Sequence, residues 1–309
     1  MARRTIRSAK SRRGCVVRIA ATGALLTIMV GAVGAYLAGG LLVAPCPAEV
    51  SPPNDVLPIE DLRIPSASGG SLAAWFAQGS RDGRAVLLLH PLHANRRAMW
   101  GRALYYHRAG YGVLLVDFQA HGESPGEHLT FGYLESRDVQ AALAYLRERL
   151  PAAKAVVHGW SLGAAAAMLA DPPLDADAFV LESPYATIEE ATRNRVRMYA
   201  GSWAAAVLTP MLVMQFKPRL GIPPEQLRPI VGLRRMDAPT LFMAGSADRR
   251  TPLDESRRIF DAAREPKALW VVEGAGHVNF QRLDPEAYRN RLFSFLDEHL
   301  GRSPEGGGD

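Results

Sequence analysis

Short apolar runs alternate along this chain with amphipathic stretches that have helical spacing. Apolar runs of strand length occur at residues 85–90, 111–117, 154–158, 178–182, 240–244 and 268–272. Helical stretches occur at residues 97–108, 134–150, 164–170 and 285–300. Continuous apolar runs suit strands that are buried on both faces. The alternation therefore predicts an α/β fold, a mostly parallel sheet flanked by helices, with a hairpin at residues 62–77 ahead of it.

One long connection breaks this alternation. Residues 185–236 lie between two predicted strands and contain no strand pattern of their own, and residues 198–216 are apolar almost all round. Connections of this length usually have a function, and ligands of open α/β sheets bind outside the carboxyl ends of the strands. We therefore expect a helical lid, called here the lid segment (residues 185–236). An ordinary pair of packing helices is the alternative.

The N-terminal region has the pattern of a membrane segment. Residues 19–44 contain no charge, and residues 1–18 form a basic leader. At about 1.5 Å per residue, a helix over residues 19–44 would span a hydrocarbon layer of roughly 30 Å. The positive leader predicts a single-pass protein of the inner (cytoplasmic) membrane with an extracytoplasmic catalytic domain. A cleaved signal peptide, giving a secreted or periplasmic protein, is the alternative.

The remaining boundaries follow from proline and glycine. Prolines are frequent in residues 45–55, which predicts a stiff linker. The compact domain is expected over residues 56–300, and the glycine-rich tail, residues 301–309, is expected to be disordered.

The net charge of +5 comes from the leader rather than from the domain. Seven basic residues and no acidic one precede Glu49, so 29 basic residues face 31 acidic ones from there on. Aromatic and basic residues are not interleaved, which argues against a nucleic-acid partner. The two cysteines, Cys15 and Cys46, both precede the predicted domain. That domain therefore needs no disulfide, and its lack of cysteine excludes thiol catalysis. The oligomeric state is not indicated.

A candidate nucleophile lies between a predicted strand and a predicted helix. Residues 159–163 read Gly-Trp-Ser-Leu-Gly, a G-x-S-x-G pattern. In a strand-turn-helix context this pattern is typical of a sharp elbow that displays the serine, with small neighbours that let other chain segments approach. We therefore predict Ser161 as the nucleophile.

A base and an orienting acid follow in the chain. His277 lies in Gly-Ala-Gly-His after the strand at residues 268–272, and Asp248 follows the strand at residues 240–244. The order Ser, Asp, His is the one expected for this fold, and each residue lies just past a strand's carboxyl end. Glu182 and Asp254 are alternative acids.

Transition-state charge requires hydrogen-bond donors for an oxyanion. The backbone N–H of Leu162, the residue after the nucleophile, is one predicted donor. The second is expected in the loop after residues 85–90, at Leu92, because Pro91 has no N–H.

Several motifs beyond these residues resemble the α/β-hydrolase fold, and specifically the serine aminopeptidase S33-like branch. They are the strand–His90 loop with Asn95-Arg96, the segment Asp117-Phe-Gln-Ala-His-Gly-Glu-Ser124, Gly132-Tyr-Leu-Glu135 and Glu182-Ser-Pro184. Pro91 and Gln119 depart from the glycine and arginine usual in that branch. The resemblance covers residues 85–300 and implies a serine hydrolase in which His90 anchors a loop. The branch includes membrane-tethered, esterase-like members.

Other polar residues receive structural interpretations. His90 and His93 lack further ligands nearby, so no metal site is predicted. His121 is expected to bind backbone and His158 to be packed. Glu135 and Asp138 lie on one helix face, where such pairs are mostly solvated or bound to arginine.

The sequence thus predicts a membrane-anchored serine hydrolase that cleaves an ester, thioester or small amide through an acyl-enzyme on a Ser-Asp-His triad. It is expected to be carboxylesterase- or lipase-like and to use no metal or organic cofactor. The substrate would be a small acyl compound, and the apolar lid suggests that it is lipid-like. Predicted substrate-binding residues are Trp160, Met198, Trp203 and Met211.

Two other functions remain open. An exopeptidase or acyltransferase would use the same triad, and a peptidase would need a lid carboxylate such as Glu189, Glu190 or Glu225 to hold a substrate ammonium. A non-catalytic membrane-tethered scaffold is the third.

Overall fold

The structure, a computed structural model, describes residues 18, 21–23, 25–26, 29–80 and 83–301. The chain divides into two compact units, Met1–Leu42 and Val43–Asp309. Residues 29–42 are helical in the first unit. Among the described residues, no helix is both long enough and apolar enough to cross a membrane. Five residues of the expected span, residues 19–44, lie outside the described part of the chain. Nearly all of the basic leader and residues 302–309 of the predicted tail also lie outside it.

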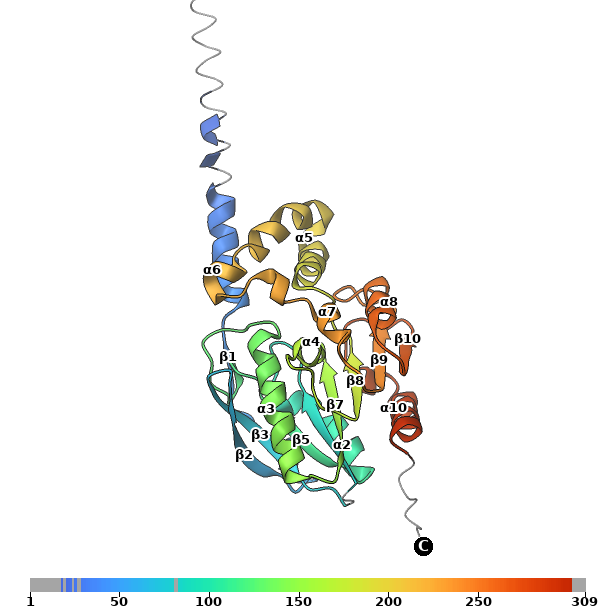
Figure 1. The fold of residues 1–309 in the computed structure, drawn as a ribbon. Helices are drawn as coiled ribbons and strands as arrows, with labels where there is room; N and C mark the ends of the chain where they lie inside the picture. The colour runs from blue at the N-terminus through green and yellow to red at the C-terminus, as the bar shows by residue number, and fades with distance from the viewer. Residues whose placement is uncertain (1–17, 19–20, 24, 27–28, 81–82, 302–309) are drawn as a thin grey trace, which may run out of the picture. The chain divides into compact units, whose positions relative to one another are not determined.

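The second unit is built on one mostly parallel sheet (Figure 1). Its strand order is β10-β9-β8-β7-β4-β5-β3-β2. The strands from β10 to β5 are parallel, while β3 is antiparallel to both β5 and β2. The bounds are β2 (Glu60–Ser66), β3 (Gly70–Ala77), β4 (Arg84–Leu89), β5 (Gly112–Val116), β7 (Lys154–Trp160), β8 (Ala178–Glu182), β9 (Thr240–Gly245) and β10 (Lys267–Val272). The predicted hairpin and all six predicted inner strands are confirmed.

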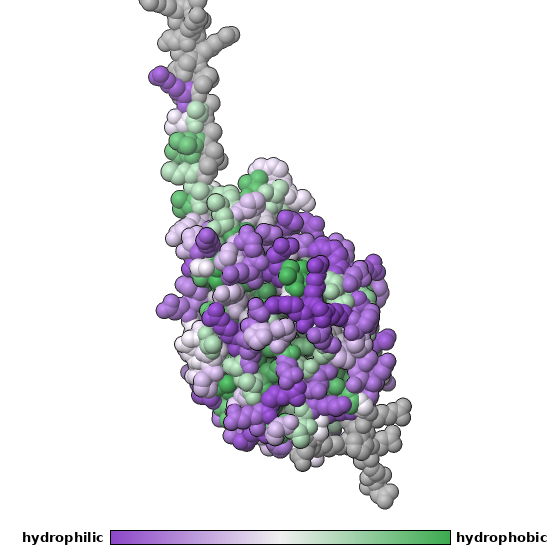
Figure 2. Space-filling view, in the orientation of Figure 1, coloured by the Kyte–Doolittle hydropathy of each residue, from purple (hydrophilic) through white to green (hydrophobic). Residues whose placement is uncertain are grey.

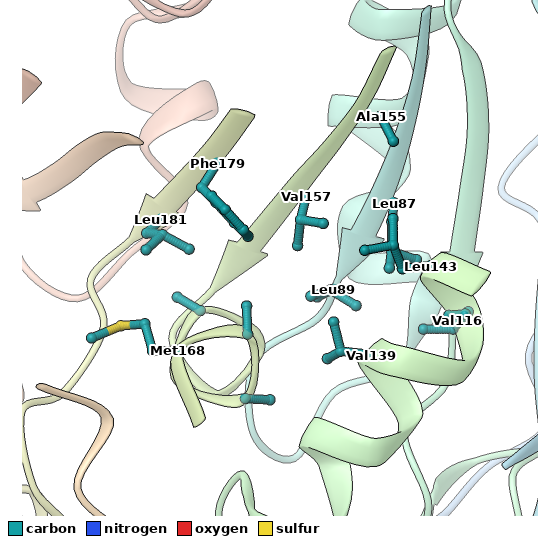
Figure 3. Packing of buried hydrophobic residues seen from close by; sticks show 14 of the residues in the cluster. Leu87, Leu89, Val116, Val139, Leu143, Ala155, Val157, Met168, Phe179 and Leu181 are labelled. Carbon is teal, nitrogen blue, oxygen red and sulfur yellow. The ribbon is translucent and has the colours of Figure 1, made fainter. Parts of the chain in front are cut away.

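Both faces of the sheet are covered because successive strand side chains point to opposite sides. In β4, Leu87 and Leu89 belong to one apolar cluster, and Val86 and Leu88 to another. Figure 3 shows the first cluster, where α3 packs against β4 and β5. The helices around the sheet are α2 (Trp100–Arg108), α3 (Tyr133–Arg149), α4 (Leu162–Leu169), α8 (Leu253–Ala262), α9 (Phe280–Leu283) and α10 (Pro285–Leu300), with the 3-10 turn η1 (Arg96–Met99) before α2.

The lid segment is helical and has no strand, as predicted. It contains α5 (Ile188–Val213), α6 (Phe216–Leu220), the 3-10 turn η2 (Pro224–Gln226) and α7 (Pro229–Leu233). The hydroxyl of Thr187 caps α5 by accepting from the Glu190 N–H at 3.2 Å. Gly201, at φ 82° and ψ 173°, interrupts the helix, a conformation that an L side chain disfavours.

The compact unit begins earlier than residue 56, where the sequence placed its start. The short strand β1 (Cys46–Pro47) pairs in parallel with β6 (His121–Gly122). The N–H groups of Cys46 and Ala48 donate to backbone oxygens at 2.8 Å, and Val50 and Leu57 are buried. Prolines at alternate positions hold the chain extended while leaving the intervening N–H groups available for pairing. The first part of the expected linker, residues 46–50, is therefore held on the domain, whereas most of residues 51–55 are exposed.

Candidate active site

The turn after β7 holds Ser161 in an unusual backbone conformation. Its φ is 53° and its ψ is −105°, a region that costs energy for any residue with a side chain. The Ser161 N–H donates to the Glu182 carbonyl at 2.8 Å, which fixes the turn to the end of β8. A Cβ at Gly159 would lie 2.4 Å from the Ala164 nitrogen, and one at Gly163 would lie 2.4 Å from the Leu89 oxygen. Both glycines of the pattern are thus required by close backbone approach.

Three side chains that are far apart in sequence meet at this turn. His277 Nε2 lies 3.0 Å from Ser161 Oγ, and His277 Nδ1 lies 2.7 Å from Asp248 Oδ2. An ionised carboxylate only accepts, so Nδ1 carries the proton and Nε2 is left to accept from the serine hydroxyl. Ser161 is half-buried, while the Asp248 side chain is fully buried. The arrangement can move a proton from a solvent-accessible hydroxyl to an imidazole.

The loops that carry Asp248 and His277 are joined by backbone contacts. The Ser246 N–H donates to Val272 O at 3.0 Å, and the Ala247 N–H donates to Ala275 O at 2.9 Å. The Ser246 hydroxyl also bridges to Glu273 and accepts from the Gly274 N–H, both at 2.8 Å. Because β9 and β10 are neighbours in the sheet, these contacts keep the acid and the base in one register.

Asp248 is held as a carboxylate by its hydrogen bonds. Burial raises the pKa of Asp248, but the hydrogen bond from His277 and those from the Thr251 and Arg250 N–H groups bring that pKa below its ordinary value. One oxygen, Oδ1, accepts the N–H groups of Arg250 and Thr251 at 2.7 and 3.0 Å. The other accepts the Thr251 hydroxyl at 2.8 Å and faces His277. Sequence reasoning missed Thr251, although its place three residues after Asp248 is a turn-like spacing that could have indicated it.

The two predicted oxyanion donors belong to different elements. Leu162 is the first residue of α4, and the first N–H groups of a helix have no partner inside that helix. Leu92 lies in the loop after β4, whose next residue, His93, has φ 57°. His90 anchors this loop: its Nε2 lies 3.1 Å from the Phe118 nitrogen and its Nδ1 lies 2.8 Å from the Pro91 oxygen. Burial holds the pKa of His90 well below its usual value, so the ring is neutral, accepts at Nε2 and donates at Nδ1.

Glu135 and Asp138 correct one expectation, because both carboxyl groups are fully buried rather than solvated. Gln119, which replaces the arginine usual in the resembled branch, donates its amide to Glu135 at 2.8 Å and its backbone N–H to Asp138 at 2.8 Å. Burial raises the pKa of Asp138 to about 7. The pair therefore fixes the loop after β5. Spacing on a helix could not reveal this for Asp138, whose partners Ser66 and Gln119 are distant in sequence. Glu135 also accepts from the N–H groups of the nearby Thr130 and Gly132. His121 Nδ1 lies 3.0 Å from the Gln119 oxygen, in agreement with its expected backbone contact.

The alternative acids do not reach His277. Asp254 is exposed. Glu182 is fully buried, where Arg102 donates to both of its oxygens and His158 Nε2 lies 2.7 Å from Oε1. Burial alone would raise the pKa of Glu182, but the Arg102 charge and the His158 hydrogen bond lower that pKa far below its usual range. Glu182 and His158 thus belong to a buried ion network behind the elbow.

The predicted substrate-binding residues come from two elements, β7 and α5. Trp160 is half-buried and packs on the cluster that contains Val86 and Leu88, with the Arg102 guanidinium 4.9 Å from the centre of its ring. Met198 and Met211 are half-buried on α5. Trp203, also on α5, is 81% exposed.

The lid brings positive rather than negative charge to the site. Arg195 of α5 interacts electrostatically with Asp248, Arg250 and His93, which belong to loops beside Ser161. Burial and the like charge of Arg250 lower the pKa of Arg195. Among the lid carboxylates, Glu189 and Glu225 are exposed, and Glu190 pairs with Arg258 at 2.8 Å. Sequence reasoning missed Arg195, because three arginines at alternate positions gave no reason to prefer it.

Comparisons with known proteins agree with this architecture. Residues 86–291 match the model of the alpha/beta hydrolase family. The chain is 26% identical over 243 residues to YqkD of Bacillus subtilis, covering 76% of this chain and 78% of that protein. It is 29% identical over 266 residues to Rv2307c of Mycobacterium tuberculosis, covering 84% and 86%. Among solved structures, the Pyrococcus furiosus esterase PF2001 superposes with a TM-score of 0.68 at 22% identity, over 84% of this chain and 99% of the esterase.

The family match covers two thirds of the chain and includes the elbow and both loops that meet it. The solved neighbour has a similar fold. The chain therefore belongs to the alpha/beta hydrolase family, and it is a hydrolase by that membership.

Proposed function

We propose that this protein is a serine hydrolase that cleaves an ester, thioester or small amide through an acyl-enzyme. The observation that carries the proposal is the continuous hydrogen-bonded line from Ser161 Oγ through His277 to Asp248, at 3.0 and 2.7 Å. The strained serine at the elbow is the second support, since such strain is concentrated at functional sites.

In the proposed reaction, His277 Nε2 takes the hydroxyl proton while Ser161 Oγ attacks the substrate carbonyl carbon. Asp248 stabilises the imidazolium, and the N–H groups of Leu162 and Leu92 donate to the oxyanion. The tetrahedral intermediate expels the leaving group, which takes the proton from His277. Water then attacks the acyl-enzyme with His277 as base, releases the acid and restores the serine. No step requires a metal or an organic cofactor.

A carboxylic ester of an uncharged alcohol is the substrate class that we favour. The aminopeptidase alternative needs a negative group to hold a substrate ammonium, whereas Arg195 is the charged lid residue that interacts with Asp248. Its guanidinium would repel an ammonium group. The sequence segments around His90, Asp117 and Glu182 favour a place in the serine aminopeptidase-like branch of the family. The activity proposed for this chain is nevertheless that of an esterase. Met198 and Met211 remain candidates for substrate contact.

The proposed location is the inner membrane, with the compact unit outside the cytoplasm. Support comes from the charge-free residues 19–44 and the seven basic residues before them. Membrane fractionation combined with N-terminal sequencing of the mature protein distinguishes an anchor from a cleaved signal peptide. An intact N-terminus in the membrane fraction is expected, and a mature chain that begins near residue 49 would contradict the anchor.

The mechanism is tested on the full chain with a fluorophosphonate probe and a series of p-nitrophenyl esters of increasing acyl length. Wild-type protein should be labelled and should hydrolyse the esters, and Ser161→Ala should lose both properties with an unchanged melting temperature. Ser183→Ala is the matched control, because Ser183 also has a positive φ, 45°, just after a strand. Full activity in Ser161→Ala, or folded wild-type protein that the probe does not label, would reject the mechanism.

A further inference from the structure

Large apolar side chains are exposed together on the outer part of the lid segment. Trp203 is 81% exposed, Tyr199 76%, Met214 70% and Val207 45%. Single exposed apolar residues are ordinary, but a group of them usually marks a binding surface. These four residues, called here the lid apolar face, account for half of the large apolar residues that are exposed between residues 43 and 301 in the described part of the chain.

The helical geometry places three of these side chains, which follow Gly201, on one side. Residues 203, 207 and 214 are separated by four and seven positions, so they fall within one narrow stripe of a helix. The opposite stripe, at residues 205, 209 and 213, is buried. The helix after Gly201 therefore buries one side and exposes large apolar side chains on the other. Figure 2 shows apolar surface over α5, bordered by hydrophilic surface.

Charge distinguishes the lid from the rest of the compact unit. The lid segment carries eight basic residues against three acidic ones, and no acidic residue lies between positions 191 and 224. The rest of residues 43–309 carries 21 basic residues against 28 acidic ones. Arg193, Arg197 and Lys217, which flank the lid apolar face in sequence, are exposed. An anionic surface would attract the lid and repel the remainder, so it would orient the molecule.

We propose that the lid apolar face docks on an anionic lipid surface. Trp203 and Tyr199 have apolar rings with a polar group, the character that places aromatic residues at the boundary between headgroups and hydrocarbon. Val207 and Met214 enter the same layer, and the basic residues contact lipid phosphates. A second copy of the chain is disfavoured as the occupant, because a symmetric contact through this face would bring two basic lids together.

Docking would bring the candidate site close to the lipid surface. Asn194 of α5 donates to Arg250 O at 3.2 Å and to Glu255 Oε2 at 2.9 Å. Arg250 is two residues from Asp248, so the first half of α5 is tied to the acid loop. Lipid docking does not depend on the proposed hydrolysis, and it can be measured in the inactive Ser161→Ala chain.

Tryptophan fluorescence gives a site-specific test. Trp75 and Trp100 are buried and Trp160 and Trp270 are half-buried, so Trp203 is the tryptophan most accessible to a quencher. The full chain is mixed with vesicles of phosphatidylglycerol and phosphatidylcholine that contain brominated acyl chains. Strong quenching of the wild type is expected, with most of it lost in Trp203→Phe and retained in Trp270→Phe. Every variant keeps the same N-terminal segment, so its membrane affinity cancels in the comparison.

Two further variants test the nature of the contact while Trp203 remains the reporter. Val207→Ser/Met214→Ser should reduce Trp203 quenching at limiting lipid by about tenfold, whereas Leu283→Ser, an exposed apolar residue outside the lid, should not. Arg193→Gln/Arg197→Gln/Lys217→Gln should reduce it on anionic vesicles, and molar salt should have the same effect.

Three results would overturn the proposal. Trp203 could remain open to aqueous iodide when vesicles are present. Quenching could be equal on pure phosphatidylcholine, which would remove the role of charge. Trp203 could become protected without lipid as protein concentration rises, which would assign the face to self-association.

Discussion

His277 with Asp248 and His158 with Glu182 are two histidine–carboxylate pairs with the same 2.7 Å separation. They differ in the third partner. The second ring nitrogen of His277, Nε2, faces the half-buried hydroxyl of Ser161. In the other pair, the fully buried carboxylate of Glu182 binds Arg102 and Tyr288 as well as His158. A short histidine–carboxylate distance therefore does not identify a catalytic pair.

The difference lies in what each carboxylate compensates. Asp248 compensates a charge that His277 would gain during the proposed reaction. Glu182 compensates a permanent charge on Arg102, whose pKa is raised because burial is outweighed by that carboxylate. Burial and the Arg102 charge lower the pKa of His158, so this ring is a neutral hydrogen-bond relay. It donates from Nε2 to Glu182 and accepts from Tyr106 at Nδ1. Asp248 is therefore placed to stabilise a positive charge that forms on His277, whereas the surroundings of His158 keep that ring neutral.

The largest expected effect separates the pairs by activity. Asp248→Asn should lower kcat/KM for ester hydrolysis by about ten-thousandfold, because an amide can stabilise the wrong tautomer of His277 and cannot balance its charge. The melting temperature should stay within about 3 °C of the wild type, since Asn Oδ1 can still accept the Arg250 and Thr251 N–H groups. A loss of activity below tenfold would remove Asp248 from the proposed triad.

The reverse pattern is expected at the buried pair. Glu182→Gln should lower the free energy of unfolding by about 3 to 5 kcal/mol, because Arg102 would remain buried without its counter-charge. Activity per folded molecule should stay within a few-fold, since only the Glu182 backbone contacts the elbow. Urea unfolding and active-site titration measure the two quantities. The double variant Arg102→Met/Glu182→Gln should recover part of the stability, and no recovery would contradict the charge argument.

Much of the site could be predicted from sequence because each residue of the proposed triad follows a strand of a parallel sheet. The apolar runs before Ser161, Asp248 and His277 fix their strands, and parallel strands bring their carboxyl ends to one edge. The glycines at 159 and 163 mark the elbow by the same logic, since each is required by a backbone neighbour.

Other features depended on distant partners that no local pattern contains. The Trp160 ring lies against the guanidinium of Arg102, which belongs to a separate helix 58 positions earlier in the chain. Residues 45–55 read as a linker because prolines are frequent there, yet the backbone of residues 46–48 pairs with the loop after β5. Asp138 was misjudged for the same reason, since its partners Ser66 and Gln119 lie 72 and 19 positions away.

A third buried carboxyl sharpens the comparison, because its hydrogen-bond partners are neutral. Glu255 accepts from the Ala186 N–H at 2.7 Å and from the Asn194 amide at 2.9 Å, which ties α8 to the lid. Burial raises the pKa of Glu255 from 4.5 to about 7. The folded state therefore binds the proton more tightly than the unfolded state. This contribution to stability is complete below pH 4.5 and is lost as the pH rises to about 7.

Glu255→Gln should remove that pH dependence. The difference in unfolding free energy between wild type and variant should change by up to about 3 kcal/mol between pH 4 and pH 8, in favour of the variant at the higher pH. Urea titrations across this range measure it. Asp138, whose pKa is also raised to about 7, keeps its own slope in both proteins and so serves as an internal reference. Parallel pH profiles for the two proteins would show that Glu255 is ionised at an ordinary pKa in the folded state.

The smallest expected effect tests how the buried network divides its work. Tyr288 donates its hydroxyl to Glu182 Oε1 at 2.5 Å, in addition to the two groups already bound there. Tyr288→Phe should lower the free energy of unfolding by about 1.5 kcal/mol, the low end for a hydrogen bond to a charged group, because Arg102 and His158 remain on the carboxylate. Tyr105→Phe is the matched control, since its ring lies 6.3 Å from that of Tyr288. If both variants lost the same stability, the loss would not be specific to the hydrogen bond that Tyr288 donates to Glu182, and Glu182 would be held by Arg102 and His158 alone.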